Sequence, residues 1–151
     1  MVSDAVMKRT MLCILAAVLI PIVAKASSAE IAVIANPSVP VTHITSAQLL
    51  DLYAGDVKEW SNGAPVIVLD LKSKSVTKDT FYKYLGKSSS RMKSIWMKNM
   101  LSGEGQPPQA QETEQDVLEK VAKTPGAIGY VNRTLVTADV IELVVIPVQS
   151  E

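Results

Sequence analysis

Apolar residues along this chain fall into short clusters whose spacing alternates between that of strands and that of helices. Compact runs rich in β-branched residues predict strands at 31–35, 66–69, 127–131 and 140–148. Apolar positions three and four apart predict helices from Thr45 or Ser46 to Gly55, from about Thr77 to Gly86, from Ser88 or Ser89 to about Leu101, and from Thr113 to Thr124. Strands separated by helices predict an α/β domain, a mixed sheet flanked by helices.

The most apolar segment of the chain lies near its amino terminus. Lys8 and Arg9 precede an apolar run at 11–23, and the small-residue pattern at 24–26 follows it. This order is typical of a secretory signal peptide, so we expect residues 1–26 to be removed and residues 27–151 to form one periplasmic domain. The run is short for a membrane span, although a retained amino-terminal anchor is the alternative.

Composition narrows the possible chemistry. Cys13 is the only cysteine and lies inside the predicted signal peptide, so the mature domain cannot use a disulfide, a Cys–His pair or a cysteine metal site. His43 is the only histidine, and it falls in a predicted linker. The mature charge is close to neutral, which is not typical of a nucleic-acid-binding domain. We therefore expect no enzyme activity, no cofactor, no metal and no nucleic-acid partner.

The stretch at 66–86 is the best candidate for a binding site. A predicted buried strand leads through a turn rich in lysine and hydroxyl groups into a helix. The N-terminus of a helix attracts anions through its free N–H groups and its dipole. The candidate ligand-binding residues are Lys72, Lys74, Ser75 and Thr77. The alternative is that Ser73, Ser75 or Thr77 only caps the helix.

Charge is distributed unevenly along the mature domain. Residues 72–98 contain eight basic side chains and one acidic one, whereas residues 104–119 contain five acidic side chains and no basic one. A basic segment can concentrate anions near the candidate turn. The alternative is two solvated helix faces of opposite sign.

Two motifs resemble segments of periplasmic phosphate-binding proteins, the substrate-binding proteins of phosphate ABC transporters. Residues 44–60, ITSAQLLDLYAGDVKEW, are similar to the family pattern L-T-x-x-x-L-x-x-I-F-x-G-x-I-x-x-W, and residues 123–131, KTPGAIGYV, contain its T-P-G-A-I-G-Y-V. The resemblance spans about 31–131. It implies one lobe of a type 2 periplasmic-binding-protein-like fold, in a small single-lobe member of that superfamily.

The resemblance also bears on the candidate turn. Phosphate-binding relatives carry R-x-D-G-S-G-T there, where arginine fixes the anion. Ser75 and Thr77 fall on the hydroxyl positions of that pattern, while Lys74 and Val76 replace glycines. Asp70 falls close to the arginine position, so we expect its carboxylate to oppose an anion. On this basis Asp70→Arg is expected to restore the family's arginine donor and to tighten phosphate binding by at least about tenfold.

The same family motifs contain aromatic and glycine residues to which we assign structural roles. Trp60 and Tyr130 are expected in the core or at a hinge rather than on a ligand. Gly126 and Gly129 are expected to allow a tight turn and a close backbone approach. In the helix that follows Ser88, Ile95 and Trp96 are expected to be buried.

Two functions remain open. The first is a solute-binding-type domain related to phosphate ABC transporter substrate-binding proteins, which binds phosphate or another small oxyanion weakly. The second is a periplasmic protein-interaction or sensing module that kept the fold and lost the ligand site. The partners that the resemblance implies are a small oxyanion, a transporter permease, and a second lobe from another subunit.

Overall fold

The computed structural model describes residues 29–149, so the predicted signal peptide and its cleavage site lie outside the described part. The strands are β1 (Glu30–Ala35), β2 (Ile67–Leu71), β3 (Gln109–Gln111), β4 (Ala127–Asn132) and β5 (Ile141–Pro147). The helices are α1 (Ser46–Ala54), α2 (Val76–Tyr84), α3 (Ser89–Ser102), α4 (Glu114–Lys123) and the short 3-10 helix η1 (Arg133–Leu135).

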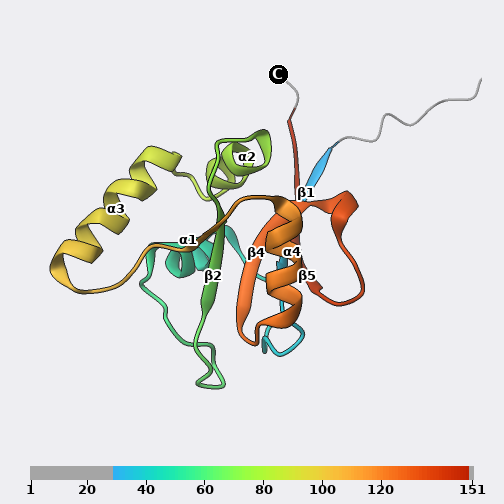
Figure 1. Ribbon diagram of the computed structural model, residues 1–151, viewed down its shortest axis with the longest axis horizontal. Helices are drawn as coiled ribbons and strands as arrows, with labels where there is room; N and C mark the ends of the chain where they lie inside the picture. The colour runs from blue at the N-terminus through green and yellow to red at the C-terminus, as the bar shows by residue number, and fades with distance from the viewer. Residues whose placement is uncertain (1–28, 150–151) are drawn as a thin grey trace, which may run out of the picture.

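The five strands form one mixed sheet in the order β3-β2-β4-β1-β5. Figure 1 labels four of them, β1, β2, β4 and β5. β2 runs parallel to β3 and β4, whereas β1 runs antiparallel to β4 and β5. The predicted α/β class with a mixed sheet and flanking helices is therefore confirmed.

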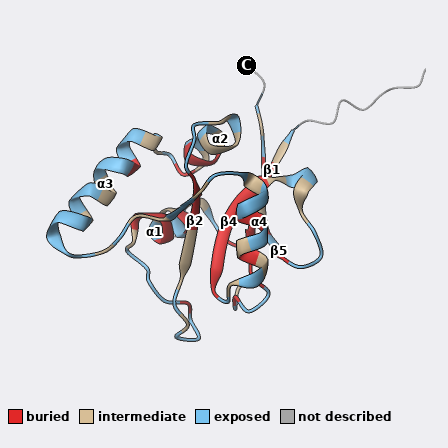
Figure 2. Ribbon diagram, in the orientation of Figure 1, coloured by how far each residue is buried: buried red, intermediate tan, exposed pale blue. Residues whose placement is uncertain are grey.

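Alternate residues of β4 face the two helical layers, as the pleat of a strand requires. Gly129 faces α4, where a Cβ atom would lie 2.6 Å from Val117 Cγ1. Tyr130 faces the other side, and its ring stacks on Phe81 of α2 with centroids 4.0 Å apart. The sheet thus lies between α4 on one face and α1 and α2 on the other, and its central strands are buried (Figure 2).

Helix boundaries follow the capping residues that the sequence predicts. Thr45, Ser75, Ser88 and Thr113 are the N-caps of α1, α2, α3 and α4, and each side chain accepts a hydrogen bond from a backbone N–H in the first turn. Thr45 and Thr113 also complete capping boxes with the third helical residue.

The structure corrects three expectations. β2 extends to Leu71, so Asp70 lies in the strand and is buried, rather than in the polar turn. The segment at 103–111, where the sequence predicts neither a helix nor a strand, ends in β3. This three-residue strand has a polar sequence without a strand pattern, and it forms by pairing with β2. Ile95 and Trp96 are only half-buried, and Met92 is the one buried residue of α3. The reason is that α3 stands away from the sheet (Figure 1).

Candidate functional site

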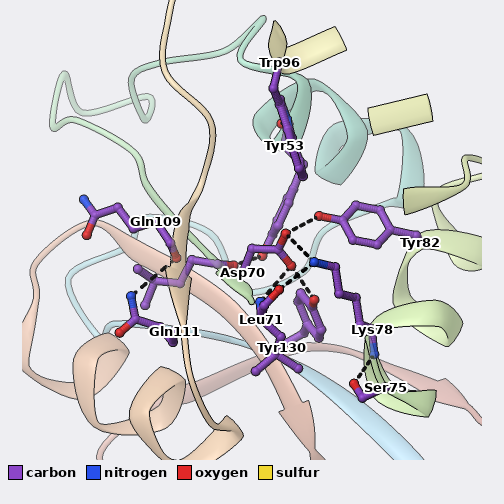
Figure 3. A network of polar contacts seen from close by, with 11 residues as sticks. Tyr53, Asp70, Leu71, Ser75, Lys78, Tyr82, Trp96, Gln109, Gln111 and Tyr130 are labelled. Carbon is purple, nitrogen blue, oxygen red and sulfur yellow. Dashed lines mark hydrogen bonds and ion pairs between the residues drawn. The ribbon is translucent and has the colours of Figure 1, made fainter. Parts of the chain in front are cut away.

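A buried carboxylate occupies the end of β2, beside the candidate turn. Asp70 is 4% exposed, and the Tyr82 hydroxyl donates to its Oδ2 at 2.8 Å (Figure 3). The Tyr130 hydroxyl and the Leu71 N–H donate to its Oδ1 at 2.5 and 2.8 Å. These donors come from α2, β4 and β2, so the carboxylate ties the helix to the two central parallel strands.

Lys78 completes this arrangement from the first turn of α2. Its Nζ lies 3.4 Å from Asp70 Oδ2 and donates to the Leu71 carbonyl oxygen at 2.6 Å. The Lys78 side chain is 14% exposed, so the ion pair is largely shielded from solvent. A buried carboxylate is tolerated only when it is paired and hydrogen-bonded, and Asp70 meets both conditions.

The buried tyrosines serve this network as neutral donors. Burial, and then the nearby Asp70 charge, raise the pKa of Tyr82 and of Tyr130 well above that of a free phenol. The same two causes raise the pKa of Tyr53, whose hydroxyl donates to the Leu69 carbonyl oxygen at 2.8 Å. All three hydroxyls therefore keep their protons at ordinary pH and donate them in hydrogen bonds within the protein.

The structure places the predicted hydroxyl residues at the start of α2. Ser75 is the N-cap, and its Oγ accepts a hydrogen bond from the Lys78 N–H at 3.1 Å. Thr77 lies in the first turn and is half-buried. The capping alternative is thus confirmed for Ser75, although a hydroxyl that accepts one hydrogen bond still has a proton to donate.

The two predicted lysines lie in the exposed turn between β2 and α2. Lys72 Nζ forms an ion pair with Glu112 at 2.6 Å, in which both side chains are about two-thirds exposed. Lys74 is exposed as well. The turn therefore brings Lys72, Lys74, Ser75 and Thr77 to one helix N-terminus, but only Ser75 and Thr77 belong to the helix and its cap.

Burial of Asp70 changes what its replacement would do. Lys78 compensates the Asp70 charge, so repulsion of an anion at the helix N-terminus is weaker than the sequence alone suggests. An arginine at this position would bring a second cation beside Lys78 and leave two tyrosine hydroxyls without their acceptor. Asp70→Arg therefore cannot test anion binding cleanly, because it disrupts the core.

The two glycines of the T-P-G-A-I-G-Y-V motif are structural. Gly126 has φ +77°, and a Cβ atom there would lie 2.3 Å from the Pro65 carbonyl oxygen. Its own carbonyl oxygen accepts a hydrogen bond from Trp60 Nε1 at 2.9 Å. Trp60 and Tyr130 are both buried, which confirms that they belong to the core.

A groove that the sequence analysis missed lies between α3 and the ends of β2 and β3. We call it the α3 groove; its volume is about 440 Å³. Its lining residues are Asp70, Leu71, Lys72, Lys78, Ser89, Ser90, Lys93, Trp96, Met97, Met100, Pro107, Pro108 and Ala110. The sequence does hold one indication of this groove: α3 carries more apolar residues than a helix can bury on a single face.

The part of the chain that the structure describes holds neither a metal-binding cluster nor a membrane-spanning helix. Between residues 29 and 149, no three His, Cys, Asp or Glu side chains are grouped so that they could hold a metal ion. Within the same range, no helix has both the length and the apolar character needed to cross a membrane.

Comparison with known proteins identifies relatives of this architecture. A family model described as a PBP superfamily domain matches residues 26–143. A Clostridium perfringens protein assigned as a phosphate ABC transporter substrate-binding protein, solved with bound phosphate, aligns with a TM-score of 0.63 and 22% identity over 77% of this chain and 44% of its own. An ABC-type phosphate transport receptor from Vibrio cholerae aligns with a TM-score of 0.60 and 18% identity over 76% of this chain and 45% of its own.

PstS from Borrelia burgdorferi is also similar, with a TM-score of 0.55 and 20% identity over 77% of this chain and 47% of its own. At these identities the likeness concerns the fold. The chain spans less than half the length of each of these three solved proteins.

Proposed function

This chain belongs to the PBP superfamily, and we propose that it is an exported member that binds another protein rather than an enclosed phosphate ion. Its relatives of known structure are named for phosphate transport, so the proposal concerns a domain that kept their fold and changed its ligand. The partners that the family suggests are a transporter permease and a second lobe from another subunit.

One observation carries the proposal, the closed network around Asp70. A site built for a buried anion needs donors that point at the ligand and have no other partner. Here the two tyrosine hydroxyls and the Lys78 ammonium at the end of β2 already bind the Asp70 carboxylate. Among residues 29–149, no buried side-chain nitrogen or oxygen is left without a hydrogen-bond partner.

Export and the absence of catalysis are parts of the same proposal. The charged start, apolar run and small-residue pattern of residues 1–26 support secretion to the periplasm with cleavage after Ala26. A binding role without catalysis is consistent with relatives that are named as receptors and substrate-binding proteins. It also agrees with a carboxylate whose hydrogen-bonding capacity is already used inside the fold.

In-cell photo-crosslinking tests whether the domain has a protein partner. A photoreactive phenylalanine is placed singly at Met97, Glu119 and Asp139, three exposed positions on α3, on α4 and before β5. We expect a discrete adduct of higher mass from at least one position in intact cells, and none after the cells are lysed and diluted. If no position gives an adduct at native expression, the protein-interaction proposal is wrong.

A second candidate function is weak binding of phosphate or another small oxyanion at the N-terminus of α2. The observation in its favour is that Lys72, Lys74, Ser75 and Thr77 gather there, while Lys78 compensates the Asp70 charge. In this candidate Ser75 and Thr77 donate their hydroxyl protons, the lysines add charge, and the first-turn N–H groups complete the contacts.

Calorimetric titration of phosphate into wild type and Ser75→Ala/Thr77→Ala tests this second candidate. Ser88→Ala is the matched control, because Ser88 caps α3 through the same contact, from the Arg91 N–H at 3.2 Å. Binding in the range of about 10 μM to 1 mM that is lost in the double variant and kept in the control would support the oxyanion site. Equal binding by all three proteins would exclude it.

A further inference from the structure

The α3 groove combines an apolar surface with positive charge at an accessible position. α3 contributes Trp96, Met97 and Met100, and the segment before β3 contributes Pro107 and Pro108. Trp96 is held in place because its Nε1 donates to the Tyr53 carbonyl oxygen at 2.7 Å. The groove is therefore bordered by one fixed aromatic ring and by flexible methionines, which adapt to irregular partner surfaces.

Exposure of apolar side chains concentrates on the same helix. Met97 is 46% exposed, Met100 is 38% exposed and Leu101 is 83% exposed. Among residues 29–149, the only other large apolar side chains that are exposed to this extent are Val57 and Val76. Clustered apolar exposure on one helix beside a groove is typical of a binding surface, whereas scattered exposure is not.

Positive side chains outnumber negative ones around the groove. Lys72, Lys78 and Lys93 line it, and Asp70 is the only carboxylate among the lining residues. Asp70 is buried and paired with Lys78, so these two charges compensate each other, and Lys72 is paired with the exposed Glu112. Lys93 is the lining lysine for which the described residues show no ion pair. An occupant with carboxylates beside apolar side chains would complement this surface.

We propose that the α3 groove binds an acidic amphipathic segment of a partner protein. Apolar side chains of the segment pack on Trp96, Met97 and Met100. Its carboxylates face Lys93 and take the place of Glu112 beside the exposed Lys72. This inference rests on the proposed function and adds the site and the chemistry of the partner. A second copy of the chain is disfavoured, because a twofold contact through α3 would bring two copies of the same basic surface together.

Peptide probes test the chemistry directly. A short fluorescein-labelled peptide of alternating leucine and glutamate is compared by anisotropy with its leucine–lysine counterpart. We expect the acidic peptide to bind at least tenfold more tightly, and Lys93→Glu/Met97→Ser to weaken it at least tenfold. Lys120→Glu on α4 is the control and is expected to bind like wild type. Equal binding of the two peptides, or binding of neither, overturns the inference.

A membrane is the alternative occupant that the same surface must be tested against. The mature protein, residues 27–151, is sedimented with phosphatidylglycerol vesicles and, separately, with phosphatidylcholine vesicles. Sedimentation with the anionic vesicles that Lys93→Glu/Met97→Ser abolishes, without binding of the acidic peptide, assigns α3 to a lipid surface and overturns the peptide proposal. If the protein does not sediment with either kind of vesicle but does bind the acidic peptide, the peptide proposal is supported.

In-cell crosslinking separates failure of this inference from failure of the proposed function. The photoreactive residue is placed at Met100 in the groove and at Glu119 on α4, with and without Lys93→Glu. An adduct at Met100 that Lys93→Glu removes supports the groove. Adducts at Glu119 alone overturn the groove and leave the protein-interaction function standing. Adducts at neither position count against both.

Discussion

The Tyr130 hydroxyl donates a 2.5 Å hydrogen bond to the Asp70 carboxylate, which joins β4 to the end of β2 across the buried side of the sheet. This contact gives the G-Y pair of the T-P-G-A-I-G-Y-V motif two separate physical roles. Gly129 lets α4 approach the strand, and Tyr130, one residue later, supplies a donor on the opposite face. The motif therefore identifies the fold more directly than it identifies a ligand.

The first prediction concerns the cost of opening this network. Asp70→Ala removes the counter-ion of the largely buried Lys78 and the acceptor of two buried tyrosine hydroxyls. We therefore expect it to lower the free energy of unfolding by about 3–5 kcal/mol. Tyr130→Phe removes one donor and should cost about 1–3 kcal/mol. Tyr84→Phe is the control, because no hydrogen bond of its hydroxyl is found among the described residues. Urea unfolding measures all three, and an Asp70→Ala cost below about 1 kcal/mol would contradict a structural role.

The second prediction concerns the helix–strand approach at Gly129. A methyl group there would lie 2.6 Å from Val117 Cγ1, so we expect Gly129→Ala to lower the free energy of unfolding by about 1–3 kcal/mol. Gly105→Ala is the control, because its nearest neighbour would be Lys58 Cε at 4.0 Å. Adding Val117→Ala should recover part of the loss in a double-mutant cycle. Additive costs would show that these two side chains do not compete for the same space.

The third prediction concerns alkaline pH. The folded state raises the pKa of Tyr53, Tyr82 and Tyr130 through burial and the Asp70 charge, whereas the unfolded chain ionises near pH 10. The stability that these three tyrosines contribute to the free energy of unfolding is therefore fully present below about pH 10. It is lost as the pH rises further, because the unfolded state then releases protons that the folded state holds.

Each of these tyrosines should make the free energy of unfolding fall by about 1.4 kcal/mol per pH unit above that point. Urea unfolding from about pH 9 to about pH 11 measures the slope. Tyr82→Phe and Tyr130→Phe should each make it shallower, since phenylalanine cannot ionise. A slope that neither substitution changes would assign the alkaline loss to other groups.

Local patterns predicted most of the fold and little of the site. The strands, the capping residues and the α/β class follow from spacing and from cap chemistry, which act over a few residues. The role of Asp70 does not, because its donors Tyr82 and Tyr130 come from α2 and β4 and meet only in the folded chain. A polar residue after an apolar run looks like the start of a turn until those partners are known.

The short strand β3 and the α3 groove were missed for similar reasons. β3 is a polar segment that becomes a strand because β2 offers it a free edge. The groove depends on how far α3 stands from the sheet, and the spacing of Ile95 and Trp96 cannot report a distance between elements. Both features depend on contacts between segments far apart in the sequence.

The fourth prediction concerns export. We expect protein recovered from the periplasmic fraction to begin at Ser27, because residues 1–26 carry the full signal-peptide pattern. Intact-mass measurement gives the starting residue directly. Full-length chain in the cytoplasmic fraction, or full-length chain retained in the membrane fraction, would contradict cleavage after Ala26.

Calorimetric titration of phosphate into the purified domain, residues 27–151, tests most directly whether the Asp70 network has replaced the ligand contact. The account predicts no saturable binding with a dissociation constant below about 1 mM, because the donors at the end of β2 are already used by the protein. One-to-one binding with a dissociation constant below about 1 mM, lost in Ser75→Ala/Thr77→Ala and kept in Ser88→Ala, would contradict it and show that the start of α2 is a working phosphate site.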